Sequence, residues 1–287
     1  MRRMWAATVA AALAYSSAVW AAPASKPQHV MSLNLCTDQL ILQLLPPERI
    51  TSVTYLSRSS EHSYLTAEAF GVPVNYGTSE EVLKEHPDLV IAGSSSTPAV
   101  RALLKRVGVP LIEVPAAESF GEIRSVTRLV ARAVGEEESA ERLLAQMDAT
   151  LRELAATAPQ RRIVVAGWDG AGNIPAKGTL FHEILSAAGA QNIAAEINTN
   201  MVYGHYASVD LEQLVALKPD ILAYGSSRVG RLDLSNERLQ HRVVRKLYRG
   251  REITYPETLY GCGLPQSAAA AGELRRAMLE TIERRAP

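Results

Sequence analysis

The 287-residue sequence predicts an α/β protein of two similar Rossmann-like lobes, each with a parallel-sheet core, joined by a single long helix. Three observations predict this fold class. One segment recurs 132 residues later, apolar runs alternate with helical patterns in both halves, and a long helical pattern separates the halves. With 47% hydrophobic and 21% charged residues, the chain has the composition of a folded globular protein.

The recurring segment is the strongest of these observations. Residues 80–95 read EEVLKEHPDLVIAGSS and residues 212–227 read EQLVALKPDILAYGSS, so that Pro87-Asp88 aligns with Pro219-Asp220 without a gap. Each copy predicts a short helix, a Pro-Asp turn, a strand buried on both faces and a Gly-Ser loop. A period this long is not that of a solenoid, and it indicates two copies of one α/β lobe.

The N-terminus has the pattern of a secretory signal peptide. Arg2 and Arg3 precede an apolar run over residues 4–14, and small residues then lead to Ala21. The apolar core is shorter than the ~20 residues that span a bilayer. We therefore expect residues 1–21 to be removed by cleavage after Ala21 and the mature protein to be soluble in an extracytoplasmic space. The first cysteine, Cys36, lies well past this region, which argues against a lipid anchor.

The N-terminal lobe is predicted over residues 22–117. Its strands are expected at residues 30–33, 50–53, 89–93 and 110–114. A helix over residues 39–45 has Thr37 or Asp38 as its cap and ends at Pro46-Pro47, and a second helix covers residues 98–107.

Residues 118–158 are predicted to be linker helices. Leucines and Met147 recur at helical spacing over residues 136–156, a helix about 30 Å long that could bridge two lobes. The alternative is an ordinary core helix of one domain. The C-terminal lobe covers residues 159–287, with strands at 162–166 and 251–255 and helices at 179–188 and 267–285.

Charge and motifs bear on the function class. The net charge is zero, which removes the bulk electrostatic attraction to nucleic acid. The sequence contains no nucleophile elbow, no P-loop and no paired metal-binding histidines. Residues 167–172 are glycine-rich like the start of a dinucleotide-binding loop, but Pro175 stands where the third glycine and the helix of such a loop should follow. We therefore expect a binding protein, with an unrecognised hydrolase as a less favoured alternative.

Taken in order, these parts resemble the class III periplasmic binding proteins, the receptor group for cobalamin and ferric siderophores. The resemblance covers essentially the whole mature chain and rests on the duplicated Glu and Pro-Asp segments around a linker helix. It implies a periplasmic receptor with a ligand cleft between lobes and limited lobe motion. Its partners would be an ABC permease dimer with its ATPase subunits, and we expect a monomer with no intrinsic cofactor and no nucleic-acid partner.

The resemblance also implies the ligand and its location. The ligand would be a metal chelate, either a corrinoid such as cobalamin or a ferric siderophore, with a bare metal ion or haem as the alternative. In open parallel sheets, ligands bind beyond the carboxyl ends of the strands. The residues predicted to line this cleft are Asn34, Cys36, Tyr55, Ser57, Arg58, Thr97, Trp168, Lys177, Tyr203, His205, Tyr206, Arg228, Tyr260 and Cys262.

The chemistry of these residues suits a large planar or amide-decorated ligand. The aromatic side chains offer flat faces with polar tips, and the cationic ones could meet carboxylates or a phosphate. Receptors for bare zinc or manganese in related families use several histidines and a carboxylate, whereas Asn34 and Cys36 follow the first strand here. The two cysteines could form a disulfide. We favour two free thiols at the cleft mouth, and a thiolate metal site with His205 and Asp169 is a minor alternative.

Glu80 and Glu212 occupy equivalent positions in the two copies of the repeat. In the family that the chain resembles, one surface glutamate per lobe contacts arginines of the two permease subunits. We therefore expect these two residues to dock the receptor onto its permease. The alternative is that both are ordinary exposed residues near helix N-termini, where acids are favoured.

Overall fold

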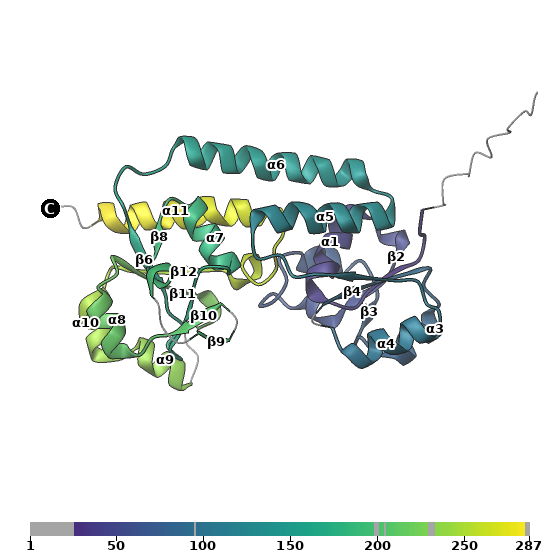
Figure 1. Cartoon of the computed structure of the whole chain (residues 1–287), viewed down its shortest axis with the longest axis horizontal. Helices are drawn as coiled ribbons and strands as arrows, with labels where there is room; N and C mark the ends of the chain where they lie inside the picture. Colours follow the sequence, from purple (N-terminus) through teal and green to yellow (C-terminus); the bar gives the residue numbers. More distant parts are fainter. Residues whose placement is uncertain (1–25, 95, 198–200, 204, 229–232, 285–287) are drawn as a thin grey trace, which may run out of the picture.

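The computed structural model describes residues 26–284, except 95, 198–200, 204 and 229–232. Two α/β lobes lie side by side beneath a layer of three long helices (Figure 1). The predicted signal peptide, residues 1–21, lies outside the described residues. Within the described part, no helix is long and apolar enough to cross a membrane.

The first lobe is a five-stranded parallel sheet in the order β3-β2-β1-β4-β5. The strands are β1 (Val30–Ser32), β2 (Ile50–Thr54), β3 (Val74–Asn75), β4 (Leu89–Gly93) and β5 (Leu111–Val114). The helices are α1 (Leu35–Leu44), α2 (Thr66–Ala69), α3 (Ser79–Glu85) and α4 (Pro98–Arg106). Four of these strands fall where the sequence predicts them, and the two-residue strand β3 was not predicted. Helix α1, however, begins four residues before the predicted start because Asn34, and not Thr37 or Asp38, caps it.

The second lobe repeats this sheet with one strand fewer. Its parallel strands have the order β12-β11-β6-β8, which matches β5-β4-β1-β2 of the first lobe. The strands are β6 (Val164–Gly167), β8 (Gln191–Asn192), β11 (Ile221–Gly225) and β12 (Glu252–Tyr255). The helices are α7 (Leu180–Ala187), α8 (Leu211–Leu217), α9 (Leu234–Leu239) and α10 (Arg242–Tyr248).

A small antiparallel sheet in the second lobe was not predicted. It has the order β7-β10-β9, with β7 (Asn173–Pro175), β9 (Met201–Tyr203) and β10 (Tyr206–Ser208). These segments were predicted to be loops. Three-residue strands are too short to show an alternating pattern, and Pro175 is tolerated because β7 is an edge strand.

The short helices of the two repeat copies begin and end in the same way. Thr78 caps α3 and Asp210 caps α8, each within a reciprocal capping box. His86 ends α3 and Lys218 ends α8, each in the left-handed conformation with φ of 48° and 50°. Prolines directly follow both residues, so the chain leaves both helices in the same way and enters the next strand in the same direction.

The aspartate of each Pro-Asp pair has a structural role. The Asp88 carboxylate accepts hydrogen bonds from the backbone N–H groups of Gln28 and His29, at 2.7 and 3.0 Å. Asp220 accepts one from the N–H of Val164 at 2.9 Å. Each aspartate therefore ties the start of its own strand to the start of the first strand of its lobe, β1 or β6.

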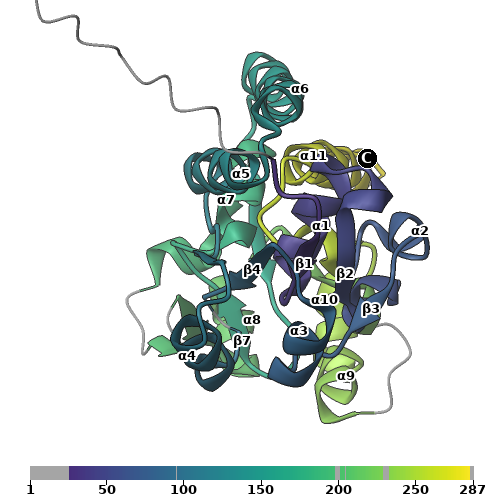
Figure 2. The ribbon, with the colours of Figure 1, turned by 90° about the vertical axis from the view of Figure 1, so that its right-hand side faces the viewer.

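Helix α6 (Glu137–Ala156) connects the lobes. It follows α5 (Phe120–Val134) after a turn at Gly135, whose φ is 73°. It lies across both α5 and α11 (Ser267–Glu283), which pack against different lobes (Figures 1 and 2). Leu144 and Met147 of α6 belong to one core cluster that reaches the sheets of both lobes. The helix predicted over residues 136–156 is therefore present and bridges the lobes.

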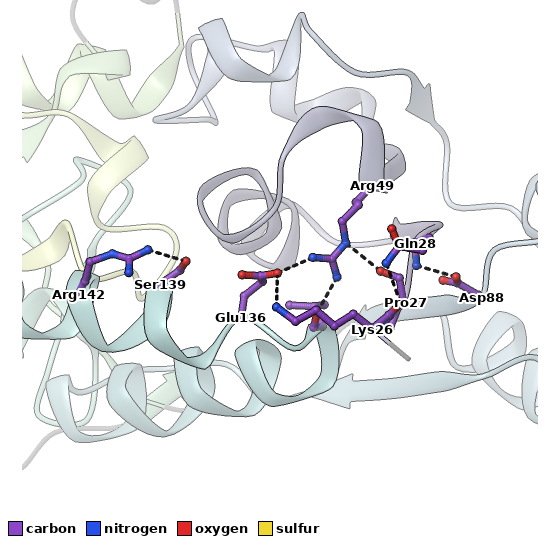
Figure 3. A network of polar contacts seen from close by, with 9 residues as sticks. Lys26, Pro27, Gln28, Arg49, Asp88, Glu136, Ser139 and Arg142 are labelled. Carbon is purple, nitrogen blue, oxygen red and sulfur yellow. Dashed lines mark hydrogen bonds and ion pairs between the residues drawn. The ribbon is translucent and has the colours of Figure 1, made fainter. Parts of the chain in front are cut away.

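A polar network anchors the beginning of the described chain to the turn between α5 and α6 (Figure 3). Glu136 accepts hydrogen bonds from Lys26 at 3.1 Å and from Arg49 at 2.5 Å. Arg49 also donates to the carbonyls of Pro27 and Val134. Burial opposes ionisation of Glu136, but the hydrogen bonds from the two cations keep the pKa of this carboxyl below its usual value. The segment ahead of β1 is thereby fixed at the helical layer, away from the cleft.

Candidate functional site

A cavity of about 370 Å³ opens between the lobes, at the carboxyl ends of both parallel sheets. The first lobe contributes the start of α1 and the residues that follow β4 and β5. The second lobe contributes the ends of β6, β11 and β12, the start of α7, and the segment before α11. The volume lies in the range of small-molecule sites, and the position is where parallel α/β sheets bind their ligands.

A disulfide bond crosses the floor of this cavity. Cys36 of the first lobe is bonded to Cys262 of the second, with their Cα atoms 5.2 Å apart. The prediction of two free thiols is therefore wrong, and so is the alternative of a thiolate metal site. The early start of α1 is the reason, because it places Cys36 in the first helical turn, facing the segment before α11.

Two further contacts close the floor beside the disulfide. A Cβ atom at Gly263 would collide with the backbone carbonyl of Ala117, so only glycine allows this close approach of the lobes. Gln266 donates a hydrogen bond to the side chain of Gln43. The two lobes are thus joined at the floor by a covalent bond, a close backbone contact and a hydrogen bond.

Three aromatic rings form a wall of the cavity on the side of the second lobe. The centroids of Tyr255 and Tyr260 are 4.5 Å apart, and Phe181 lies 5.2 and 5.9 Å from them. Gly167 makes room for Phe181, because a Cβ there would lie 2.7 Å from the ring. Burial, and then the neighbouring Tyr255 and Glu273, raise the pKa of Tyr260, which keeps its hydroxyl protonated as a hydrogen-bond donor.

Three carboxylates also line the cavity, each fixed by donors from the protein. Glu118 accepts a hydrogen bond from the backbone N–H of Leu180 at 2.9 Å, which links the end of the first lobe to the start of α7. Asp169 accepts from the N–H groups of Ala171 and Asn173 at 2.8 and 3.1 Å. Glu257 accepts from the hydroxyl and the N–H of Ser227 at 2.6 and 3.0 Å.

Tyr206 of β10 lies among these acids. Its side chain is 43% exposed and lines the cavity. Burial raises its pKa, and the charges of Glu118 and Asp169 raise it further. The Tyr206 hydroxyl is therefore a protonated donor in an electrostatically negative part of the cavity.

A second hollow of about 270 Å³ lies on the first lobe and shares Asn34 with the main cavity. Tyr55 and Tyr76 stack there with their ring centroids 5.1 Å apart, 50% and 69% exposed. Thr97 lines the same hollow. Together the hollow and the cavity form an extended cleft with aromatic surfaces on both lobes.

The structure brings together half of the residues predicted for the cleft. Five of the predicted residues line the main cavity: Asn34, Cys36, Tyr206, Tyr260 and Cys262. Tyr55 and Thr97 line the second hollow. The side chains of Tyr203 and Arg228 lie outside the described part of the structure.

Trp168 does not line the cleft, which corrects the prediction. It is 1% exposed, belongs to the core beneath β10, and its indole N–H donates to the Val209 carbonyl at 3.0 Å. Trp168 follows a strand, and successive side chains of a strand point to opposite faces. Position at a strand end alone does not determine which face a residue takes.

Four other predicted residues also lie away from both hollows. Ser57 is fully buried and donates to Asp38 at 2.7 Å. Arg58 donates to the carbonyls of Ala69 and Val72, and its guanidinium lies 5.3 Å from the centroid of the Phe70 ring. Lys177 and His205 are exposed, with the His205 ring packed over Gly178. These side chains serve local structure or solvent contact.

Four cavity residues were not predicted: Glu118, Phe181, Tyr255 and Glu257. Asp169 was predicted only in the loop after a strand and as a ligand of the alternative thiolate metal site. One signal could have found the acids, because each follows the carboxyl end of a parallel strand: β5, β6 or β12. No sequence signal identifies Phe181, which reaches the cavity from the first turn of α7.

Glu80 and Glu212 are exposed at matching positions, the second residues of α3 and α8. The two helices lie in the lower part of the molecule in Figure 1, one on each lobe and on the side opposite α6. The predicted equivalence of these residues is therefore present in the fold.

The chain is similar to proteins of one family. Residues 30–245 match the family model described as "Periplasmic binding protein". A cobalamin-binding protein of Halobacterium salinarum is 27% identical over 216 residues, which cover 73% of this chain and 56% of the relative. The chain thus spans little more than half the length of that relative.

Solved structures share the fold at low sequence identity. The vitamin B12 binding protein BtuF of Vibrio cholerae has a TM-score of 0.66 at 14% identity, with 90% of this chain and 99% of that chain covered. The heme-binding protein RhuT of Roseiflexus sp. RS-1 has a TM-score of 0.70 at 22% identity, with 88% and 98% covered.

Proposed function

Because the chain belongs to the periplasmic binding protein family, we propose that it captures a metal chelate in the interlobe cavity and delivers it to an ABC permease. One observation carries the proposal: the cavity lies at the carboxyl ends of both parallel sheets and has an aromatic wall of Phe181, Tyr255 and Tyr260. Aromatic faces suit a broad planar or amide-bearing ligand. The names of relatives that bind cobalamin and heme support this ligand class.

The donor set supports a chelate in preference to a bare metal ion. In the part of the chain that the structure describes, no group of three or more His, Cys, Asp or Glu side chains is arranged so that it could hold a metal ion. The two cavity cysteines are bonded to each other and supply no thiolate. A ligand that brings its own metal coordination needs only shape, stacking and hydrogen bonds from the protein.

The fixed floor supports a receptor that changes shape little. Helix α6 packs on both α5 and α11, and the disulfide joins the lobes below the cavity. Any relative motion of the lobes would have to bend around this floor and open the cleft at its outer rim. A disulfide also suits the oxidising compartment that the predicted signal peptide implies.

Docking to a permease is the second part of the proposal. Glu80 and Glu212 are exposed on matching helices, one on each lobe, and a two-subunit permease presents two related surfaces. Charges at such an interface mainly set orientation and association rate. We propose that these two carboxylates contact basic residues of the two permease subunits.

Titration of the mature protein with cobalamin, heme and ferric hydroxamates, followed by thermal shift and by isothermal calorimetry, tests the ligand proposal. We expect at least one chelate to stabilise the protein at micromolar concentration. If only free metal ions stabilise it, the chelate proposal is wrong.

A further inference from the structure

The charged side chains in the described lining of the main cavity are all negative. Glu118, Asp169 and Glu257 line it, and no Lys or Arg side chain does so among the described residues. Two of the cations predicted to meet ligand anions lie elsewhere, since Arg58 is bonded to backbone carbonyls and Lys177 is exposed outside the cavity. The Arg228 side chain is outside the described part of the structure. The formal charge of the described lining is therefore three negative charges.

Helix N-termini oppose this charge without balancing it. The first turns of α1 and α7 reach the cavity, and each N-terminus is equivalent to about half a positive charge. The α7 N-terminus already faces Glu118 through the N–H of Leu180, and the Asn34 side chain accepts the N–H of Cys36 in α1. Two such ends offset about one of the three charges, so a negative potential remains.

The aromatic wall of the cavity attracts cations, as the three carboxylates do. Tyr255, Tyr260 and Tyr206 line the same space as the carboxylates. The face of an aromatic ring attracts cations, and this attraction strengthens where water is partly excluded. Burial is the main cause of the raised pKa of Tyr206, and the charges of Glu118 and Asp169, which line the same cavity, raise it further.

We infer that this cavity selects a chelate with net positive charge over a neutral or anionic chelate of the same skeleton, an inference that rests on the function proposed above. Corrinoids with an exchangeable neutral axial ligand and hydroxamate complexes with a pendant ammonium belong to this class. Tricatecholate iron complexes and the propionate edge of heme have the opposite charge, and the described lining offers them no cationic partner.

Two matched pairs of chelates test the inference. Aquacobalamin carries one positive charge more than cyanocobalamin, and ferrioxamine B carries one more than N-acetylferrioxamine B. Dissociation constants are measured by calorimetry with the mature protein at low and physiological salt. We expect the cationic member of a pair that binds to be about fivefold tighter, and the preference to shrink as salt rises.

Variants that remove a cavity carboxylate test whether these charges cause the preference for the cationic chelate. Asp169→Asn and Glu257→Gln should each weaken the cationic member by roughly twofold and leave the neutral member nearly unchanged. Glu237→Gln, an exposed carboxylate of α9 outside the cavity, is the matched control and should change neither. The neutral member reports folding, because a misfolded variant would lose both members together.

Each outcome has one meaning. A cationic preference that each of the two cavity variants reduces supports the inference. Equal affinities, or tighter binding of the neutral member, overturn the inference while the proposed function stands. If neither pair binds and heme binds instead, the charge inference is wrong although a chelate receptor remains. If no chelate binds, the proposed function itself fails and the inference fails with it.

Discussion

Cys36 at the start of α1 and Cys262 ahead of α11 are joined by a disulfide bond, although 226 residues separate them in the sequence. The bond connects the first lobe to the second at the floor of the ligand cavity. Together with Gly263 against Ala117 and the bridging helix α6, it fixes the distance between the lobes at their base. We therefore expect the cleft to act as a preformed site more than as a hinged clamp.

Reduction of this disulfide should destabilise the folded protein. Closing so long a loop removes much of the entropy of the unfolded chain, and we expect a loss of about 3–5 kcal/mol in the free energy of unfolding. Urea unfolding with and without reductant measures it. The Cys36→Ser, Cys262→Ser double variant is the control and should not respond to reductant. Two thiols that react with a labelling reagent in the native oxidised protein would contradict the bond.

Trp168 and Tyr206 should have opposite phenotypes. Trp168→Ala empties a core position and should lower the free energy of unfolding by about 3–5 kcal/mol. Tyr206→Ala removes a cavity side chain and should weaken binding of aquacobalamin or ferrioxamine B by about 1–2 kcal/mol, with little change in stability. Chemical denaturation and calorimetry on both variants decide the assignment. A stable Trp168→Ala protein with impaired binding would reverse it.

The fold could be predicted from the sequence because its signals are local and repeated. The Pro-Asp segments give the same cap, left-handed helix end and strand in both lobes, and the bridging helix has an unbroken apolar stripe. The antiparallel strands β7, β9 and β10 could not be predicted, since three residues show no period.

The site could be predicted only in outline. The rule that ligands bind at the carboxyl ends of strands located Asn34, Tyr206 and Tyr260 in the cavity. The same rule failed for Trp168 and Arg58, because the direction of a side chain depends on packing that the rule does not contain. The disulfide was left as the less favoured alternative, and the approach of Cys36 to Cys262 depends on the true start of α1, which the Asn34 cap sets.

Charge reversal at the two docking positions should separate binding from transport. In the Glu80→Lys, Glu212→Lys double variant we expect uptake through the partner permease to be lost and chelate affinity to stay unchanged, since both residues lie outside the cavity. Uptake of radiolabelled chelate in cells that express the permease measures the first, and calorimetry the second. Glu237→Lys is the matched control. Wild-type uptake by the double variant would exclude the proposed docking role.

Asp38 should make stability depend on pH between 4 and 6. Burial raises its pKa from 3.8 to about 6, although hydrogen bonds from Thr54 and Ser57 favour the ionised form. The unfolded chain ionises this group near pH 4 whereas the folded protein keeps it protonated to about pH 6. Its contribution to stability is therefore complete below pH 4 and is lost as the pH rises through 6, by about 3 kcal/mol.

The Asp38→Asn variant lacks this titration. The free energy of unfolding of the wild type relative to the variant should fall by about 3 kcal/mol from pH 4 to pH 7. Urea unfolding of both proteins at four pH values measures the difference. Parallel pH profiles would show that the buried carboxyl does not titrate in this window.

Blocking the interlobe cavity tests most directly the proposal that this cavity is the binding site of a metal-chelate receptor. Ala116 is exposed and lines the cavity, whereas Ala145 is exposed on α6 far from it. Calorimetric titration with aquacobalamin, ferrioxamine B and heme should show binding to the wild type and to Ala145→Trp, and a loss of at least tenfold in Ala116→Trp. Equal affinity in Ala116→Trp, or no binding of any chelate to the wild type, would contradict the claim.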